Sequence, residues 1–261
     1  YACLLRNTAD VADKINFAYM AAIRRVELGA NTGIAQTGGF GMCHKLAAVS
    51  LPLGLSSIGG AAFMSCHQIG AIILPSGATA AGNRFATSIT NDVRVCMPPT
   101  LATIGYQAFA SSSISRIQIP NSVTAIEYSV FNGCSNLNLG VIPAGLTSLS
   151  TYTFYGSEIA SADIRSVKIK ILNNSTFQSC NWLAYVKIPP NIVSIYNNCF
   201  SDSHALAVLD FTEHTAVPNM TSTNALEGTA DDLEIRVPAE LADAWKAATN
   251  WATYADHIVG V

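Results

Sequence analysis

A short alternation of apolar and variable residues recurs along most of the chain and predicts a series of brief β-strands. In each triplet two apolar residues flank one variable residue, and a proline usually follows at once. Because neighbouring residues of a strand point to opposite faces, the flanking residues should face a core and the middle one solvent. The clearest copies are VSL at 49–51, IIL at 72–74, VCM at 95–97, IQI at 117–119, VKI at 186–188 and IRV at 235–237. Going back by one period finds VEL at 26–28, and the poorest copy is ADI at 162–164, with Arg165 where proline is expected.

A phenylalanine recurs between these triplets at intervals of 22 to 24 residues. The series is Phe40, Phe63, Phe85, Phe109, Phe131, Phe154, Phe177 and Phe200, with Leu226 in the ninth place. The third residue after each Phe is always Cys or Ser: Cys43, Cys66, Ser88, Ser112, Cys134, Ser157, Cys180 and Ser203. A period of about 23 residues lies in the range of repeats that stack into solenoids, where equivalent side chains form ladders through the core.

Such a chain should fold as one elongated domain, because a three-residue strand is stable only when it pairs with its equivalents. We expect about ten strands over residues 26–237, stacked at about 4.8 Å. The two ends of a solenoid need covers. Residues 1–25 are predicted to form an N-terminal helical cap, because Val11, Ile15, Tyr19 and Ile23 share one helical stripe over 8–24.

Residues 238–261 are predicted to form a C-terminal capping helix and tail. Pro238 suits a helix start, and Leu241, Trp245 and Ala248 would share one face. Trp245, Trp251 and Tyr254 should then seal the last coil. The alternative for the tryptophans is a carbohydrate-binding role.

The repeats resemble a known family. Residues 51–66 (LPLGLSSIGGAAFMSC), 119–137 (IPNSVTAIEYSVFNGCSNL) and 188–200 (IPPNIVSIYNNCF), with the tail at 237–256, are similar to BspA-type leucine-rich repeats. The resemblance covers roughly residues 26–256 and fades at 84–98 and 157–171. It implies a leucine-rich-repeat solenoid of the α/β type, with short parallel strands and helical caps.

The resemblance also implies a class of function. Proteins of this family are surface or secreted proteins linked to adhesion and to binding of host or matrix proteins. We therefore expect a non-enzymatic binding module, extracellular or on the cell surface, whose partner is a host or matrix protein or a surface glycan. The alternatives are a phage or virion receptor-binding protein on the same scaffold, a structural spacer of a larger surface protein, and an enzyme hidden in the irregular segments.

Composition narrows these classes. Only 12% of residues are charged and the formal net charge is −3, which disfavours nucleic-acid binding because that requires a basic face. No apolar run approaches the length of about 18 residues typical of a membrane span. Motifs of hydrolases, metalloproteases and nucleotide-binding loops are absent from the sequence, so we predict no catalytic residues and no cofactor.

Two Cys-His dipeptides, Cys43-His44 and Cys66-His67, raise the alternative of a tetrahedral zinc site. The cysteines occupy the repeated Cys/Ser position, so they should point into the core while the histidines point away. We therefore expect unpaired buried thiols and no metal, although a disulfide between Cys43 and Cys66 in adjacent coils is conceivable.

The outward residues of the strands form the candidate binding face, since they vary while their inward neighbours stay apolar. Arginine and tyrosine are enriched in binding hot spots. Arg94, Arg116 and Gln118 are predicted to form one patch, and Tyr185, Lys187 and Asp210 another. The full candidate set is Arg25, Glu27, Arg94, Arg116, Gln118, Tyr185, Lys187, Asp210, Glu234 and Arg236.

Overall fold

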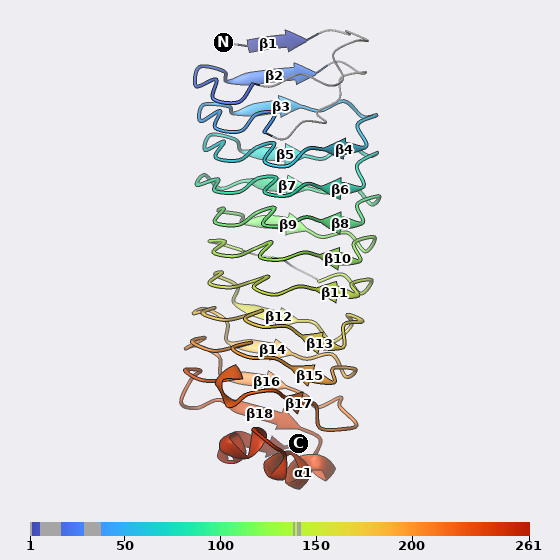
Figure 1. The fold of residues 1–261 in the computed structure, drawn as a ribbon, viewed down its shortest axis with the longest axis vertical. Helices are drawn as coiled ribbons and strands as arrows, with labels where there is room; N and C mark the ends of the chain where they lie inside the picture. The colour runs from blue at the N-terminus through green and yellow to red at the C-terminus, as the bar shows by residue number, and fades with distance from the viewer. Residues whose placement is uncertain (1, 6–16, 29–37, 138, 140–141) are drawn as a thin grey trace.

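The chain forms a solenoid of stacked coils with its two termini at opposite ends (Figure 1). The computed structural model describes residues 2–5, 17–28, 38–137, 139 and 142–261. Each coil contributes one or two short strands, and every strand pairs in parallel with the equivalent strand of a neighbouring coil. The parallel solenoid predicted from the repeat is therefore confirmed.

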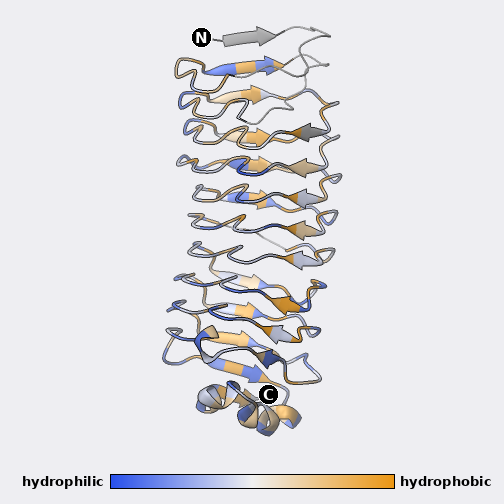
Figure 2. Ribbon diagram, viewed as in Figure 1, coloured by the Kyte–Doolittle hydropathy of each residue, from blue (hydrophilic) through white to orange (hydrophobic). Residues whose placement is uncertain are grey.

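The first row of strands contains the triplets seen in the sequence, each strand starting one residue earlier. Alternation of apolar and polar residues along these strands is visible in Figure 2. Even the poorest copy, at 162–164, contributes to a strand. The row comprises β1 (Ala2–Leu5), β2 (Arg25–Leu28), β3 (Ala48–Ser50), β5 (Ala71–Ile73), β7 (Arg94–Cys96), β9 (Arg116–Gln118), β12 (Ser161–Asp163), β14 (Tyr185–Lys187), β16 (Val208–Asp210), β18 (Glu234–Val237) and β19 (Ile258–Gly260).

A second row of two-residue strands, which the sequence analysis did not predict, runs along another side of the solenoid (Figure 1). Where a proline follows a first-row strand, it starts a turn that leads toward the second row, as in the hydrogen bond from the Ile192 N–H to the Pro189 carbonyl, 3.1 Å. The row comprises β4 (Ser57–Ile58), β6 (Ala80–Ala81), β8 (Thr103–Ile104), β10 (Ala125–Ile126), β11 (Ser148–Leu149), β13 (Ile171–Leu172), β15 (Ser194–Ile195) and β17 (Asn219–Met220).

The phenylalanines form a continuous stack through the core. All eight, Phe40, Phe63, Phe85, Phe109, Phe131, Phe154, Phe177 and Phe200, are at most 1% exposed. The rings of Phe131, Phe154 and Phe177 are nearly parallel, with centroids 5.6 and 5.2 Å apart. Aromatic pairs at such distances add to the stabilisation from apolar burial. The stack therefore couples each coil to the next through its centre.

Phe85 enters this stack from a neighbouring backbone position. The Phe63 N–H donates to the Phe85 carbonyl, whereas in other coils the equivalent acceptor precedes the ladder residue. Ala86 is thus the true equivalent of Phe63, and the Phe85 ring lies at 85° to that of Phe63. The same shift places Ile89, not Ser88, in the Cys/Ser position, which corrects the register read from the sequence.

Except in the coil of Ile89, the Cys/Ser position holds a hydrogen-bond donor. Cys66 Sγ donates to the Phe40 carbonyl at 3.0 Å, and Ser203 Oγ donates to the Phe177 carbonyl at 2.7 Å. Cys43, Cys134 and Cys180 make the same contact with the preceding coil. Burial raises the pKa of Cys66, Cys134 and Cys180 to about 12, so these thiols stay protonated and can donate. Either Cys or Ser suits this position, because both have small side chains that donate a hydrogen bond.

Replacing Cys134 tests this donor role. Cys134→Val removes the bond to the Phe109 carbonyl, and we expect it to lower the free energy of unfolding by about 1 kcal/mol or more. Cys134→Ser keeps a donor of the kind found at Ser203 and should cost less. Urea denaturation of the three proteins measures both values. Equal losses would show that volume alone decides this position.

The N-terminal helix predicted over 8–24 is wrong in its described part. Residues 17–24 form turns that continue the repeat, with the Phe17 ring stacked on Phe40 at 5.4 Å and 4°. Phe17 lies one period of 23 residues before Phe40, so the ladder begins one coil earlier than predicted. Of the residues of the predicted stripe that the structure describes, Tyr19 is 76% exposed and only Ile23 packs against the core. Residues 8–16 lie outside the described residues.

The C-terminal end is covered by short helical segments: η2 (Ala239–Leu241), α1 (Ala242–Ala247) and η3 (Trp251–His257), while η1 (Thr223–Ala225) lies in the coil before. Trp245 and Trp251 are fully buried, and Tyr254 Oη donates to the Thr223 carbonyl. A sugar-binding role for the tryptophans is therefore wrong, since neither indole face is free. Strand β19, unpredicted, adds the tail to β18.

His214 is buried under this cap without a hydrogen-bond partner on either ring nitrogen. It contacts Phe211 and Trp245, with ring centroids 5.0 and 6.3 Å away. Burial lowers the pKa of His214 because the imidazolium would lose its hydration, and the nearby carboxylates of Asp210 and Glu213 offset this only in part.

A loss of stability in mild acid should follow. The unfolded chain takes up a proton at this histidine near pH 6.5, while the folded chain does so only at lower pH. The free energy of unfolding should thus fall as the pH drops below about 6.5. His214→Leu should flatten this dependence in denaturant titrations between pH 7 and 5. An unchanged slope would assign the acid sensitivity to other groups.

Candidate binding face

The outward side chains of the first row of strands form the candidate face. Arg25, Arg94, Arg116, Gln118 and Glu234 are exposed. Glu27, Tyr185, Lys187 and Arg236 are partly exposed. Asp210 is only 7% exposed, so its placement on the open face is wrong. The face is therefore not uniformly available, and its charges differ in how they are paired.

At both ends of the face the charges neutralise each other within one strand. Arg25 Nη2 lies 2.7 Å from Glu27 Oε1 in β2, and Arg236 Nη2 lies 2.7 Å from Glu234 Oε2 in β18. Residues two apart on a strand share a face, so such pairs form locally. They leave little unbalanced charge for a ligand.

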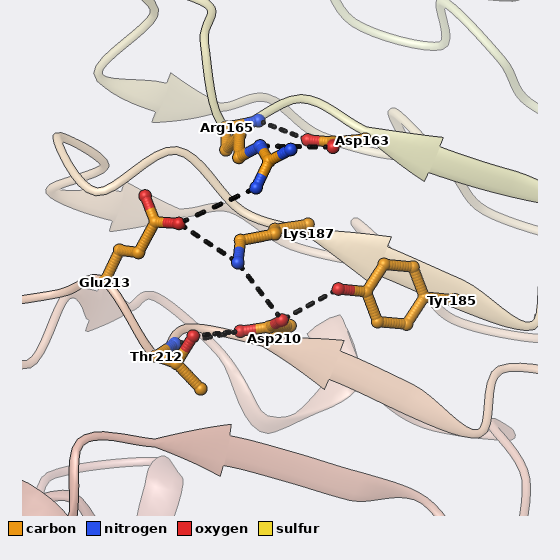
Figure 3. Close-up of polar contacts among 7 residues, drawn as sticks. All are labelled: Asp163, Arg165, Tyr185, Lys187, Asp210, Thr212 and Glu213. Atoms are coloured by element: carbon orange, nitrogen blue, oxygen red, sulfur yellow. Dashed lines mark hydrogen bonds and ion pairs between the residues drawn. The ribbon is translucent and has the colours of Figure 1, made fainter. Parts of the chain in front are cut away.

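The second predicted patch is a closed polar cluster that spans three coils (Figure 3). Asp210 Oδ2 accepts a hydrogen bond from Tyr185 Oη at 2.7 Å and lies 3.6 Å from Lys187 Nζ. Its other oxygen accepts from the N–H and hydroxyl of Thr212, at 3.0 and 2.7 Å. Lys187 Nζ also contacts Glu213 Oε1 at 3.0 Å. Arg165 joins Asp163 and, at 4.0 Å, Glu213.

The pKa values in this cluster show that its polar and charged groups stabilise one another. Burial alone would raise the pKa of Asp210, but the hydrogen bonds from Thr212 and Tyr185 and the Lys187 ammonium outweigh it, so the pKa is lowered. The bond to Glu213 raises the pKa of Lys187 despite burial. Burial, and then the hydrogen bond to Asp210, raises the pKa of Tyr185. The groups of this cluster are thus engaged with one another.

Removing the central cation should destabilise the fold. Lys187→Met leaves the nearly buried Asp210 carboxylate without its cation, and we expect a loss of about 1–2 kcal/mol in the free energy of unfolding. Thermal or urea unfolding measures it. Adding Asp210→Asn should recover part of the loss, and failure to do so would show that Lys187 acts through packing alone.

The first predicted patch is different, because its arginines have no ion-pair partner among the residues that the structure describes. Arg94 in β7 and Arg116 in β9 are register partners in the parallel sheet, as are Cys96 and Gln118. These four residues, with Met97 and Ser115, line an open depression over the two strands. Two like charges therefore lie side by side on an exposed hollow.

A row of tyrosines lies on another side of the solenoid and was not predicted from the sequence. Tyr106 and Tyr128 stack at 5.5 Å, and Tyr152 and Tyr155 extend the row. The Arg84 guanidinium lies over the Tyr106 ring at 5.7 Å. The signal was available, since Tyr106 and Tyr128 both precede a ladder phenylalanine by three residues. Only Tyr106 and Tyr128 are nearly parallel, at 14°, whereas the next two pairs are tilted at 58° and 60°.

The repeats seen in fold and sequence agree with a family model, described as BspA type Leucine rich repeat region, which matches six copies over residues 13–138 and 102–224. The chain belongs to this family. No curated protein matches it.

Three solved structures are similar to this leucine-rich repeat chain at 14–19% identity. A leucine-rich repeat protein of Bacteroides ovatus is 15% identical, with 99% of this chain and 92% of that one covered and a TM-score of 0.42. A leucine rich cell surface protein of Faecalibacterium prausnitzii is 19% identical, with 85% and 69% covered and a TM-score of 0.48. The pneumococcal vaccine antigen PcpA is 14% identical, with 91% and 66% covered and a TM-score of 0.45.

In this leucine-rich repeat chain the two Cys-His dipeptides do not converge. Cys43 and Cys66 point into the core and are free thiols, whereas the rings of His44 and His67 stack on each other outside it at 5.1 Å. His44 Nδ1 lies 3.0 Å from the Ser65 carbonyl. The dipeptides thus belong to two separate ladders of the repeat.

The irregular segment 84–98 contributes to the open depression and does not create a deep cleft. The residues that line the depression include neither a carboxylate nor a histidine. General acid–base catalysis needs such groups within hydrogen-bond reach of a substrate. The lining of the hollow presents guanidinium and amide donors. Within the described ranges, no helix has the length and apolar character to cross a bilayer.

Proposed function

We propose that this chain is a non-enzymatic binding module of a cell-surface or secreted protein. It engages its partner, a host or matrix protein or a surface glycan, through the exposed face of the first row of strands. The contact is centred on Arg94, Arg116 and Gln118. Membership of the BspA-type family supports the class of function.

The observation that carries the proposal is the uneven pairing of charges along the face. Arg25 and Arg236 are neutralised within their strands, and Lys187 within its cluster. Arg94 and Arg116 alone among these cations lie unpaired over a depression. Arginine side chains of this kind commonly dominate the energetics of binding surfaces.

Binding of the purified chain to an array of matrix proteins and glycans tests the proposal. The variant Arg94→Ala/Arg116→Ala should lose binding while keeping the thermal stability of the wild type. Lys168→Ala/Lys170→Ala is the matched control, because it removes the same charge from exposed positions outside the proposed contact. If nothing binds, or if the arginine variant binds equally well, the assignment of this face fails and the chain is better regarded as a structural spacer.

A further inference from the structure

We propose that Arg94 and Arg116 together hold an oxyanion, the carboxylate or sulfate group of an acidic polysaccharide. This inference rests on the proposed function, since it names the ligand chemistry of the same face. It starts from the charge pattern of the strands and from the shape of the hollow.

Most other charged strands carry a counterion two residues away, and Lys187 in β14 pairs with Asp210 and Glu213 of the next coil. Glu27 forms an ion pair with Arg25, Glu234 with Arg236, and Arg165 with Asp163. In β7 and β9 the corresponding positions after the arginines hold Cys96 and Gln118, which carry no carboxylate. The face therefore neutralises itself elsewhere and leaves two cations uncompensated here.

The acidic residue nearest in sequence, Asp92, is hydrogen-bonded to Ser115 of the hollow and forms no ion pair with either arginine. Both carboxylate oxygens of Asp92 accept hydrogen bonds from Ser115, one from its N–H at 3.0 Å and one from its hydroxyl at 2.8 Å. Like charges opposite each other on neighbouring strands are destabilising by themselves. A bound anion between Arg94 and Arg116 would remove this repulsion.

The geometry suits an oxyanion with two or more oxygens. Arg94 and Arg116 are register partners on adjacent strands, about 4.8 Å apart. Guanidinium groups present planar forks of N–H donors that match carboxylate or sulfate oxygens. Gln118 follows on the same face of β9 and supplies an amide to neighbouring hydroxyl groups.

The surroundings favour a polysaccharide over an acidic protein. A protein partner usually anchors an aromatic or aliphatic side chain in a desolvated pocket. The depression is open, and its apolar residues Val95 and Ile117 are buried beneath the sheet. Ile73, 65% exposed and in register with Cys96, offers one apolar patch on which the carbon face of a sugar can rest.

Calorimetric titration with four defined polymers tests the inference: polygalacturonate, dextran sulfate, uncharged dextran and poly-glutamate. We expect the two acidic polysaccharides to bind, with affinity that falls as NaCl is raised, and dextran not to bind. Arg94→Ala/Arg116→Ala should weaken binding by about tenfold to a hundredfold. Arg94→Lys/Arg116→Lys should keep part of it, and Lys168→Ala/Lys170→Ala should match the wild type.

Cys96 provides an independent readout of location. It is partly exposed in the hollow, whereas Cys43, Cys66, Cys134, Cys180 and Cys199 are buried. Its alkylation by iodoacetamide, identified by comparison with Cys96→Ser, should slow when polygalacturonate is bound. Unchanged alkylation with intact binding would place the polysaccharide elsewhere.

The outcomes separate this inference from the proposed function. Equal affinity of the arginine variant and the wild type for both acidic polysaccharides would overturn the inference. Stronger binding to poly-glutamate than to either polysaccharide would assign the site to an acidic protein. If the arginine variant loses an uncharged partner found on the array and no acidic polysaccharide binds, the binding face stands and the oxyanion site is wrong.

Discussion

Phe154→Ala should lower the free energy of unfolding by about 3–5 kcal/mol, because it opens a cavity in the centre of the aromatic stack. Phe154 is fully buried between Phe131 and Phe177, whose ring centroids lie 5.6 and 5.2 Å away. In a solenoid each coil contacts only its neighbours, so the substitution weakens two interfaces at once. Urea denaturation followed by circular dichroism measures the loss.

Two controls define this result. Val193→Ala, at a position 55% exposed, should change stability by no more than about 0.5 kcal/mol. Phe154→Leu keeps most of the apolar volume and should cost clearly less than alanine. A loss below about 1 kcal/mol for Phe154→Ala would mean that neighbouring coils collapse into the space, and the stack would then not couple the coils.

The repeat made the architecture predictable, because in a periodic sequence the spacing of equivalent residues indicates which of them contact each other. Residues that share a phase of the 23-residue period lie in adjacent coils, and the apolar phases point inward. Phe131 and Phe154, or Val186 and Leu209, could thus be placed side by side from the sequence alone. Phe17 lies one period before Phe40 and stacks on it, so the same rule holds one coil nearer the N-terminus than predicted.

The register read from the sequence is wrong at 84–89, because two neighbouring backbone positions can each place a side chain in the same space in the core. At 84–89 the aromatic ring and the small donor both sit one residue away from their usual phase. A side chain as long as phenylalanine reaches the same space from a neighbouring backbone position, so matching residue types hid the slip. The two-residue strands were missed for a related reason, since pairs such as Ala80–Ala81 carry too little alternation to be noticed.

The candidate face was predictable only as a set of outward positions. Alternation told which side chains leave the core, but not which of them bind each other. Asp210 occupies an outward position and is nevertheless buried, because Tyr185, Lys187 and Thr212 surround it. These contacts join two adjacent coils and depend on side-chain conformation. The lack of partners at Arg94 and Arg116 became visible for the same reason only in the structure.

The C-terminal cap is the second place where one side chain should matter most. Trp251→Ala is expected to lower the free energy of unfolding by about 3–5 kcal/mol. Its indole is fully buried, lies 4.6 Å from the Trp245 ring and 5.7 Å from Phe211, and donates from Nε1 to the Pro218 carbonyl at 2.7 Å. Denaturant unfolding monitored by tryptophan fluorescence measures the loss.

The location of the damage is as informative as its size. Terminal coils of a solenoid are held by a single neighbour, so loss of the cap should open the last coils first. Hydrogen exchange should therefore rise over β16, β18 and β19 in Trp251→Ala and stay unchanged near Phe109, at the middle of the stack. Trp251→Phe keeps an aromatic ring but loses part of the indole volume and the bond to Pro218, and should cost less than alanine, about 1–3 kcal/mol. Uniform exchange along the whole chain would instead show that the solenoid unfolds as one cooperative unit, in which the cap stabilises every coil equally.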